Sequence, residues 1–125
     1  MKKEIINTNN APAPVGPYSQ AVKANGFIFV SGCIPLTPDT NEIVSDVKEA
    51  ARLVFSNLKN ILEAGGSDFS KVVKVTIFLS DMSMFQEVNK IYSEFAVEPF
   101  PARSTIAVKE LPGSVCIEAD AIALA

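Results

Sequence analysis

Apolar residues recur every three or four positions between residues 47 and 64, which is the spacing of a helix that buries one face. The recurring positions are Val47, Ala50, Ala51, Val54, Phe55, Leu58, Ile61 and Leu62. Ser45 is a good N-cap for this helix, and the carboxylate of Asp46 suits the positive end of the helix dipole. Because Gly65 and Gly66 follow, the pattern predicts a helix from Val47 to Ala64.

A second helical stripe predicts a helix within residues 81–95. Its apolar members are Phe85, Val88, Tyr92 and Phe95. The run from Ser83 to Gln86 has the S-x-x-Q spacing of a capping box at a helix start. Pro99 and Pro101 prevent the helix from continuing, since proline has no backbone N–H and clashes with the preceding turn.

Shorter runs with strand character lie around these two helices. They cover residues 4–6, 21–24, 27–31, 72–79, 103–108 and 115–124, and the run 27–31 is expected to be buried. Within the fourth run, Val73, Val75, Ile77 and Leu79 share one face. The order of strands and helices predicts an α+β fold, with a mixed six-stranded sheet and both helices packed on one face.

The other face of this sheet has no element to cover it. Leu36, Phe78, Ile122 and Leu124 are apolar side chains that neither helix is expected to reach. An exposed apolar sheet face implies a partner, and a second copy of the same chain is the simplest one. We therefore expect a homo-oligomer.

Residues 100–125 are expected to form a hairpin of two strands. Leu111, Pro112 and Gly113 lie between the strands and favour a turn. If Val108 pairs with Val115, Arg103 becomes a diagonal neighbour of Glu118, at about 7–8 Å. The pattern thus predicts a charged pair within an otherwise apolar sheet.

Two interpretations of Arg103 and Glu118 are open from these residues. The simpler one is an exposed ion pair across two strands, worth ~0–1 kcal/mol. The other is a small-molecule site in which Arg103 grips a carboxylate through two parallel N–H···O bonds. In such a site Glu118 holds or activates a water molecule.

The composition of the chain limits the kinds of catalytic and metal site that it can form. A chain of 125 residues with 48% apolar residues is expected to form a single folded domain, residues 1–125. The absence of His removes histidine metal sites, the Ser-His-Asp triad and the Cys-His pair together, so no metal is expected. Cys33 and Cys116 are isolated thiols without CxxC spacing, which fits a reducing compartment.

Charge and hydropathy bear on partners and location. The net charge is −3 and the lysines are scattered, so nucleic acid is not an expected partner. No apolar run approaches the ~20 residues that span a bilayer, so no membrane partner is expected either. The first fourteen residues contain no apolar core of a signal peptide, so we expect a cytoplasmic protein.

Five segments resemble the RidA (YjgF) family of reactive-intermediate deaminases. They are GPYSQAV at 16–22, FVSGCIPLTP at 29–38, FQEVNKIYSEF at 85–95, FPARSTIAV at 100–108 and IEADAIA at 117–123. The resemblance implies a chorismate-mutase-like fold of the Bacillus type and a homotrimer with clefts between subunits. It also implies hydrolysis of enamines and imines, such as 2-aminoacrylate, 2-iminopropanoate and 2-iminobutanoate, to 2-keto acids and ammonia. No cofactor is implied.

The same resemblance assigns roles to individual residues. Arg103 matches the arginine that binds the substrate carboxylate, and Glu118 matches the glutamate that orients a water near the imine carbon. Tyr18 matches a loop tyrosine that closes the cleft. Gly32 and Thr105 match positions whose backbone polar groups face the ligand.

Three further positions carry weaker implications. Asn89 matches a family asparagine, for which a structural role is the interpretation considered. Thr105 and Cys33 depart from the pattern, since many members have Cys and Gln there. Cys33 either lines the cleft or fills space. An imine is already electrophilic, so the chemistry needs no covalent thiol.

A rival interpretation is a non-catalytic protein that binds keto acids in the same cleft. Arg103 serves either function, whereas Glu118 discriminates between them, because a pure carboxylate binder gains nothing from an anion beside its ligand. A role as a nuclease or translation factor fits poorly with the acidic charge and the absence of His.

Overall fold

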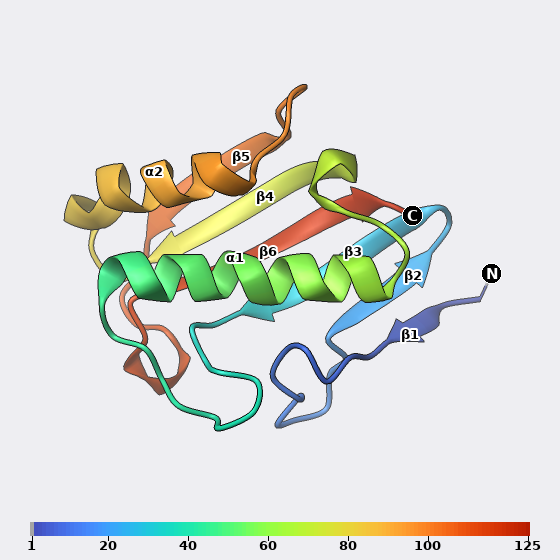
Figure 1. Ribbon diagram of the computed structural model, residues 1–125, viewed down its shortest axis with the longest axis horizontal. Coiled ribbons are helices and arrows are strands. Elements are labelled where there is room, and N and C mark those ends of the chain that lie inside the picture. The colour runs from blue at the N-terminus through green and yellow to red at the C-terminus, as the bar shows by residue number, and fades with distance from the viewer. Residues whose placement is uncertain (1) are drawn as a thin grey trace.

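The computed structural model describes residues 2–125, which form one sheet and two α-helices (Figure 1). The elements are β1 (Glu4–Ile6), β2 (Ala21–Ala24), β3 (Phe27–Cys33), α1 (Val47–Ala64), β4 (Val72–Leu79), α2 (Phe85–Phe95), β5 (Ala102–Ala107) and β6 (Ile117–Leu124). Three short 3-10 segments lie at Phe69–Lys71, Met82–Met84 and Pro112–Ser114. The predicted bounds of α1 are confirmed at both ends.

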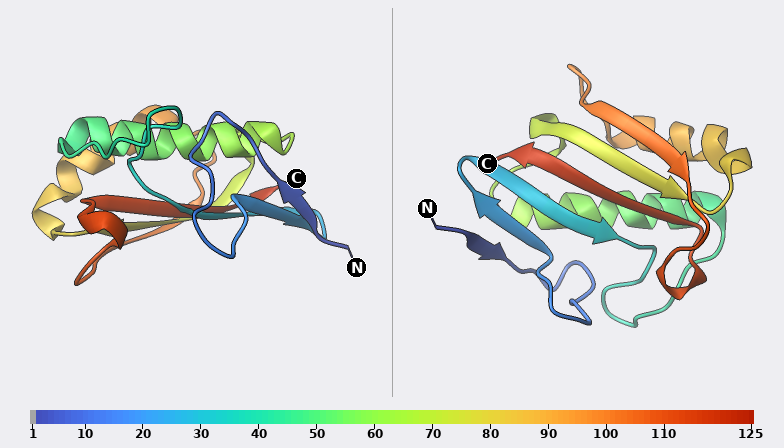
Figure 2. Two further views of the ribbon diagram at one scale, coloured as in Figure 1. Left: turned by 90° about the horizontal axis from the view of Figure 1, so that it is seen from below. Right: turned by 180° about the vertical axis from the view of Figure 1, so that it is seen from behind.

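The sheet has the strand order β1-β2-β3-β6-β4-β5. β4 and β5 are parallel, and every other neighbouring pair is antiparallel. Both helices lie on the same face of this sheet, as the side view in Figure 2 shows. The predicted α+β class, with a mixed six-stranded sheet covered on one face, is therefore confirmed.

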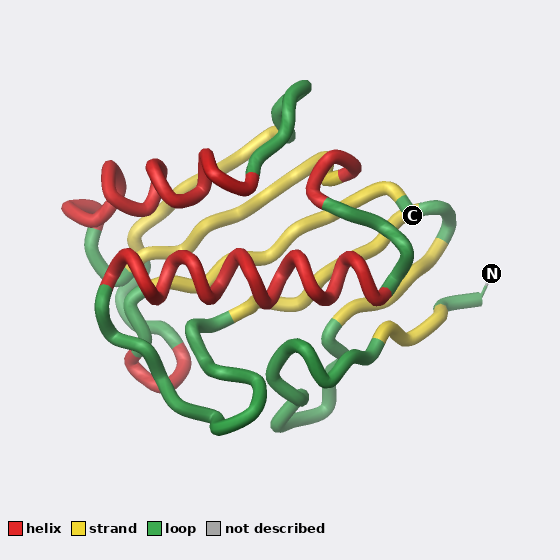
Figure 3. Tube along the Cα trace, viewed as in Figure 1, coloured by secondary structure: helices red, strands yellow, loops and turns green. Residues whose placement is uncertain are grey.

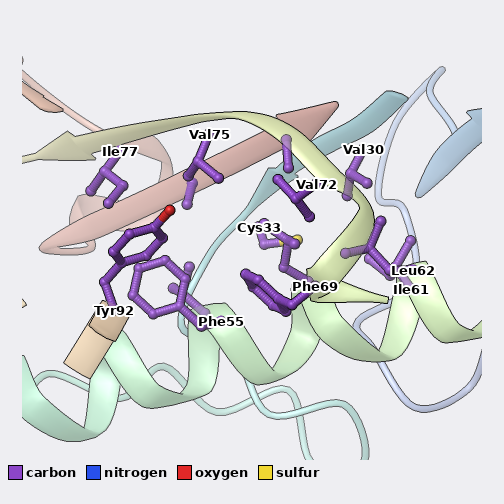
Figure 4. Packing of buried hydrophobic residues seen from close by; sticks show 14 of the residues in the cluster. Val30, Cys33, Phe55, Ile61, Leu62, Phe69, Val72, Val75, Ile77 and Tyr92 are labelled. Carbon is purple, nitrogen blue, oxygen red and sulfur yellow. The ribbon is translucent and has the colours of Figure 1, made fainter. Parts of the chain in front are cut away.

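The core fills the space between the helices and the sheet (Figure 4). Its largest fully buried apolar side chains include Phe55, Ile28, Leu58, Leu62, Ile77 and Leu79. Each such side chain contributes ~1.5–3 kcal/mol when it leaves water. Phe55 from α1 packs against Tyr92 from α2, with ring centres 5.4 Å apart. The two helices are thus held to each other as well as to the sheet.

The predicted hairpin of residues 100–125 is wrong, because β4 lies between β5 and β6. Arg103 pairs with Val75 of β4, and Glu118 pairs with Phe78 of the same strand. The chain from residue 108 to residue 116 crosses the end of β4 instead of making a tight turn. An apolar β4 thereby gains partners on both sides, which the pattern of residues 100–125 alone does not reveal.

The side chains of β5 alternate between the two faces of the sheet. Arg103 lies on the helix face, where it contacts α2. Ser104 lies on the uncovered face, where its hydroxyl accepts a hydrogen bond from Lys74 of β4 at 3.0 Å. Glu118 alternates with the buried Ile117 and Ala119, so its side chain also lies on the uncovered face. Arg103 and Glu118 are therefore on opposite faces of the sheet.

Irregularities in two strands explain further differences from the pattern. The register of β4 shifts between Val72 and Lys74, so Val72 is buried while Val73 is 38% exposed. β3 is longer than predicted, and Phe27 and Phe29 lie on the uncovered face. A strand exposed on one side alternates in burial, which a short apolar run does not show.

The helix starts also differ from the predicted caps. Asp46, and not Ser45, is the N-cap of α1, and its carboxylate accepts from the backbone N–H of Glu49 at 3.1 Å. The capping box from Ser83 to Gln86 does not form. Instead Asp81 caps the 3-10 segment before α2 by accepting from the backbone N–H of Ser83 at 2.8 Å.

No helix covers the other face of the sheet, as the rear view in Figure 2 shows. Phe27, Phe29, Ile106 and Leu124 are each 36% to 46% exposed there. Phe78 and Ile122 are half-buried on the same face, as predicted, whereas Leu36 lies in the loop after β3. Within residues 2–125, neither helix has the length and apolar character of a membrane span.

Candidate active site

Arg103 lies on β5 with its guanidinium against α2. Its Nη1 donates to the Oδ1 of Asn89 at 2.6 Å. Its Cζ lies 5.6 Å from the ring centre of Phe85 and 5.1 Å from that of Tyr92. Both distances are within the range of cation–π attraction. Three side chains of one helix therefore orient this guanidinium.

A cavity of about 390 Å³ opens beside Arg103. Its walls are Asn89, Tyr92, Ser93, Ala96, Phe100, Pro101 and Arg103. Among the described residues, no carboxylate forms an ion pair with Arg103, since the two ion pairs there join Arg52 to Glu94 and Lys59 to Glu63. An arginine with free donors at a cavity is a suitable site for an anionic ligand.

Thr105 follows Arg103 on the same face of β5, and its Oγ1 is buried. Neither this hydroxyl nor that of Tyr92 has a hydrogen-bond partner among the described residues. In Figure 4 the Tyr92 hydroxyl points toward the sheet, near Ile77 and Val75. Burial raises the pKa of this phenol, while the charge of Arg103 opposes the shift. We call Arg103, Thr105, Phe85, Asn89 and Tyr92 the arginine half-site.

Glu118 lies on β6, where its side chain covers Gly32 of the neighbouring β3. A Cβ atom at Gly32 would lie 2.7 Å from the carboxyl carbon of Glu118, closer than real Cβ atoms approach. Only glycine therefore leaves room for this carboxylate. Burial raises the pKa of Glu118, and repulsion from the carboxylate of Asp120 raises it further.

Tyr18 lies on the loop between β1 and β2, close to Gly32. Both residues line a small cavity of about 70 Å³, together with Ser31, Cys33 and Leu36 among others. Tyr18 is 51% exposed, and its hydroxyl accepts from the backbone N–H of Val15 at 3.4 Å. The loops 7–20 and 34–46 that bound this cavity lie next to each other along one edge of the molecule (Figure 3). We call Glu118, Gly32 and Tyr18 the glutamate half-site.

The side chain of Gln20 holds the loop that carries Tyr18. Its Nε2 donates to the backbone oxygens of Thr8, Ala11 and Pro12 at 3.0, 3.2 and 2.9 Å. Its Oε1 accepts from the backbone N–H of Thr8 at 2.8 Å. No strong signal in the sequence points to this role, although a buried amide among loop carbonyls is well suited to it.

Both cysteines are free thiols, as predicted. Cys33 is 7% exposed and packs in the core, while it also borders the small cavity beside Gly32. Burial, with repulsion from Glu118 and Asp120, raises its pKa to about 12. A thiol with this pKa is protonated at neutral pH and is a poor nucleophile. Among residues 2–125, no group of three potential metal-ligating side chains comes together.

The two half-sites are separated within one chain. Along the sheet β4 lies between β5 and β6, and across it Arg103 and Glu118 occupy opposite faces. Two steps between neighbouring strands amount to about 10 Å. A small ligand bound to Arg103 therefore does not reach Glu118 of the same chain. The predicted residues form two groups and not one site.

Three relatives resemble this chain over nearly its whole length. A RutC family protein of Pyrococcus horikoshii is 50% identical over 122 residues, 97% of each chain. Reactive Intermediate Deaminase A, chloroplastic, of Arabidopsis thaliana is 47% identical over 98% of this chain and 66% of that protein. The 2-iminobutanoate/2-iminopropanoate deaminase of Dermatophagoides farinae is 43% identical over 96% of this chain and 94% of that protein.

Solved structures share the same fold. A putative endoribonuclease from Thermotoga maritima superposes with a TM-score of 0.96 and 48% identity, covering 100% of this chain and 98% of that one. The YjgF gene product of E. coli superposes with a TM-score of 0.92 and 43% identity, covering 97% of this chain and 98% of that one. E. coli TdcF with bound serine superposes with a TM-score of 0.93 and 38% identity, covering 98% of each chain.

Fold and sequence together define a small α+β protein of the chorismate-mutase-like type. A sequence model of the family described as Endoribonuclease L-PSP matches residues 8–125. The chain belongs to this family, which is the RidA/YjgF family of the resemblance noted in the sequence. Some relatives carry the name of an imine deaminase, and others only that of the RutC family or of an endoribonuclease.

Proposed function

We propose that this protein hydrolyses short 2-imino acids and their enamine tautomers to 2-keto acids and ammonia. The observation that carries the proposal is Arg103, an oriented guanidinium at a cavity with no carboxylate partner among residues 2–125. Such a group binds a planar carboxylate with two parallel hydrogen bonds. The names of the relatives in Arabidopsis thaliana and Dermatophagoides farinae support the same reaction.

In the proposed mechanism Arg103 holds the substrate carboxylate and thereby orients the imine carbon. Glu118 accepts a proton from a water molecule as the water oxygen forms its bond to that carbon. The same carboxyl group then returns the proton to the nitrogen. The hydroxyl group formed from the water then gives its remaining proton to the nitrogen by way of Glu118. As this proton moves, the C–N bond breaks, ammonia leaves, and the oxygen becomes the ketone oxygen. A glutamate whose pKa is raised by burial suits both proton transfers near neutral pH.

The separation of the half-sites within one chain supports a site that is shared between two copies of the chain. We propose a homotrimer in which the arginine half-site of one subunit faces the glutamate half-site of its neighbour. The apolar uncovered face supports this assembly, because Phe27, Phe29 and Leu124 would leave water on contact with other subunits. In that arrangement the ligand carboxylate lies near Arg103 of one subunit and the imine carbon near Glu118 of the other.

A coupled assay tests the proposed reaction. A pyridoxal-phosphate dehydratase acting on serine releases 2-aminoacrylate, and the appearance of pyruvate is followed with and without this protein. Wild type should accelerate keto-acid formation, and Arg103→Ala should reduce the acceleration by at least about tenfold, because a charged hydrogen bond is worth ~1.5–3 kcal/mol. No acceleration by wild type would refute the proposed reaction.

A keto-acid binding protein is the competing function, and the bound serine of E. coli TdcF shows that a related protein binds an amino acid. Glu118→Gln separates the two, because it keeps the shape of the side chain and removes the base. Loss of hydrolysis by ~10²-fold with retained keto-acid binding indicates catalysis. A nuclease activity is not favoured, since the net charge is −3 and the chain contains no His.

A further inference from the structure

One face of α2 supports the guanidinium of Arg103. Phe85, Asn89 and Tyr92 occupy positions i, i+4 and i+7, so they lie in one row along the helix. The rings at both ends of the row lie within 5.6 Å of the guanidinium carbon, and the amide between them accepts its hydrogen bond at 2.6 Å. We call these three residues the α2 row.

Every contact made by the α2 row leaves the charge of Arg103 without a counter-charge. An aromatic face attracts a cation through its quadrupole, and an amide oxygen accepts a hydrogen bond while staying neutral. Of the five N–H donors of the guanidinium, only one is used by a side chain among residues 2–125. The remaining donors and the full charge are available at the cavity.

We infer that Asn89 is a positioning residue whose neutrality matters: it orients Arg103 without competing with the ligand for its charge. An aspartate has nearly the same shape, and it would offer Arg103 a permanent carboxylate in place of the ligand carboxylate. The inference rests on the proposed function only in taking a ligand carboxylate as the partner of Arg103. It assigns to Asn89 a part in binding, and to Phe85 and Tyr92 the support of the guanidinium plane.

The isosteric variant Asn89→Asp provides the test, with 2-oxobutanoate as the probe ligand. Calorimetry should show binding weakened roughly ten- to a hundredfold, because the introduced carboxylate occupies donors that the ligand needs. The Tm should stay the same or rise, since the variant gains an ion pair. In the coupled assay KM should rise more than kcat falls. Asn89→Ala should weaken binding less than Asn89→Asp, since it removes the acceptor without adding a charge.

One matched control tests the effect of the added charge, and one further variant tests the effect of the aromatic ring. Gln86→Glu adds the same charge at an exposed position of α2, and its effect on binding should be within about twofold because solvent screens it. Tyr92→Leu removes the ring face and should weaken binding several-fold, as expected for a cation–π contact.

The outcomes are distinct. Wild-type affinity in Asn89→Asp would overturn the inference, and so would a joint fall of Tm and affinity, since that assigns Asn89 a purely structural role. A wild-type protein that does not bind 2-oxobutanoate would overturn it as well. A wild-type protein that binds 2-oxobutanoate but does not hydrolyse imines would refute the proposed reaction and leave the role of Asn89 supported.

Discussion

Among single residues, the contact between Gly32 and Glu118 determines where the proposed base lies. The space that a Cβ at Gly32 would need is filled by the end of a flexible side chain and not by backbone. An added methyl group would therefore displace the carboxylate and leave the strand in place. Gly32 thus acts through Glu118 and needs no contact with the ligand.

Gly32→Ala is expected to reduce imine hydrolysis by at least about tenfold, because a misplaced general base loses part of its ~10²–10⁴-fold contribution. Binding of 2-oxobutanoate through Arg103 should change little, and the Tm should stay within a few degrees. The coupled assay, calorimetry and thermal unfolding measure these three quantities. Full activity of the variant would show that the position of Glu118 does not limit the reaction.

The pH dependence of hydrolysis should report the ionisation of Glu118. Burial and the charge of Asp120 raise its pKa above the ordinary 4.5, so the base becomes available only at higher pH. Asp120→Asn removes the repulsion and should move the acid limb of kcat/KM to lower pH. A profile that does not move would exclude this coupling.

The free energy of unfolding should depend on pH in the opposite direction to hydrolysis. Protonated Glu118 adds its full contribution to stability below pH 4.5, and this contribution is lost as the pH rises through the raised pKa.

How far the site could be predicted also depends on single residues. The residue types and the family resemblance are enough to single out Arg103 and Glu118, because neither signal depends on the register of the strands. The pairing of the two was wrong, because it assumed that strands close in sequence are neighbours in the sheet. Phe85 and Tyr92 were predicted as part of a buried stripe, since periodicity does not reveal that a ring also faces a cation.

Among elements, α1 was the easiest to predict and the β5 strand the hardest. Helix α1 carries a long periodic stripe and ends at Gly65, and these local signals need no tertiary information. β5 pairs only with β4, and its orientation is parallel because α2 connects the two strands. Strand order depends on contacts between distant segments, so a local turn signal at residues 111–113 was misleading.

The loop between β1 and β2 depends on Gln20, whose amide donates to three backbone oxygens. Gln20→Glu replaces these donors with an acceptor only, so the three carbonyls lose their partner. We expect the free energy of unfolding to fall by about 1–3 kcal/mol, measured by urea denaturation. Hydrogen exchange should also rise in residues 8–19, with Gln86→Glu as the control for added charge. An unchanged urea midpoint would contradict this role of Gln20.

For the whole molecule, the uncovered sheet face and the separated half-sites lead to the same proposed assembly. Phe29→Lys would place a charge at the centre of the uncovered face. Light scattering should give about three times 13.4 kDa for wild type and a lower mass for this variant. A stable wild-type monomer at micromolar concentration would exclude both the homotrimer and the cleft between subunits.

Mixed assemblies provide a direct test of the shared cleft. Arg103→Ala and Glu118→Gln should each have much less activity than wild type when assembled alone. If the two variants are unfolded and refolded together in equal amounts, about a quarter of the clefts should combine an intact Arg103 with an intact Glu118, by random mixing. The coupled assay should then recover a corresponding part of the wild-type rate. No recovery would indicate that both residues act from the same chain.

The position of Arg103 and Glu118 on opposite faces of one sheet also has a consequence for the timing of activity. A newly folded chain carries every residue of the proposed reaction and still has no complete cleft. In the proposed assembly, function begins only when subunits meet, so a refolding chain should show native secondary structure before it shows any turnover. The lag between the recovery of secondary structure and the recovery of turnover should shorten as the protein concentration rises, because the encounter of subunits, and not folding, then limits the recovery of activity.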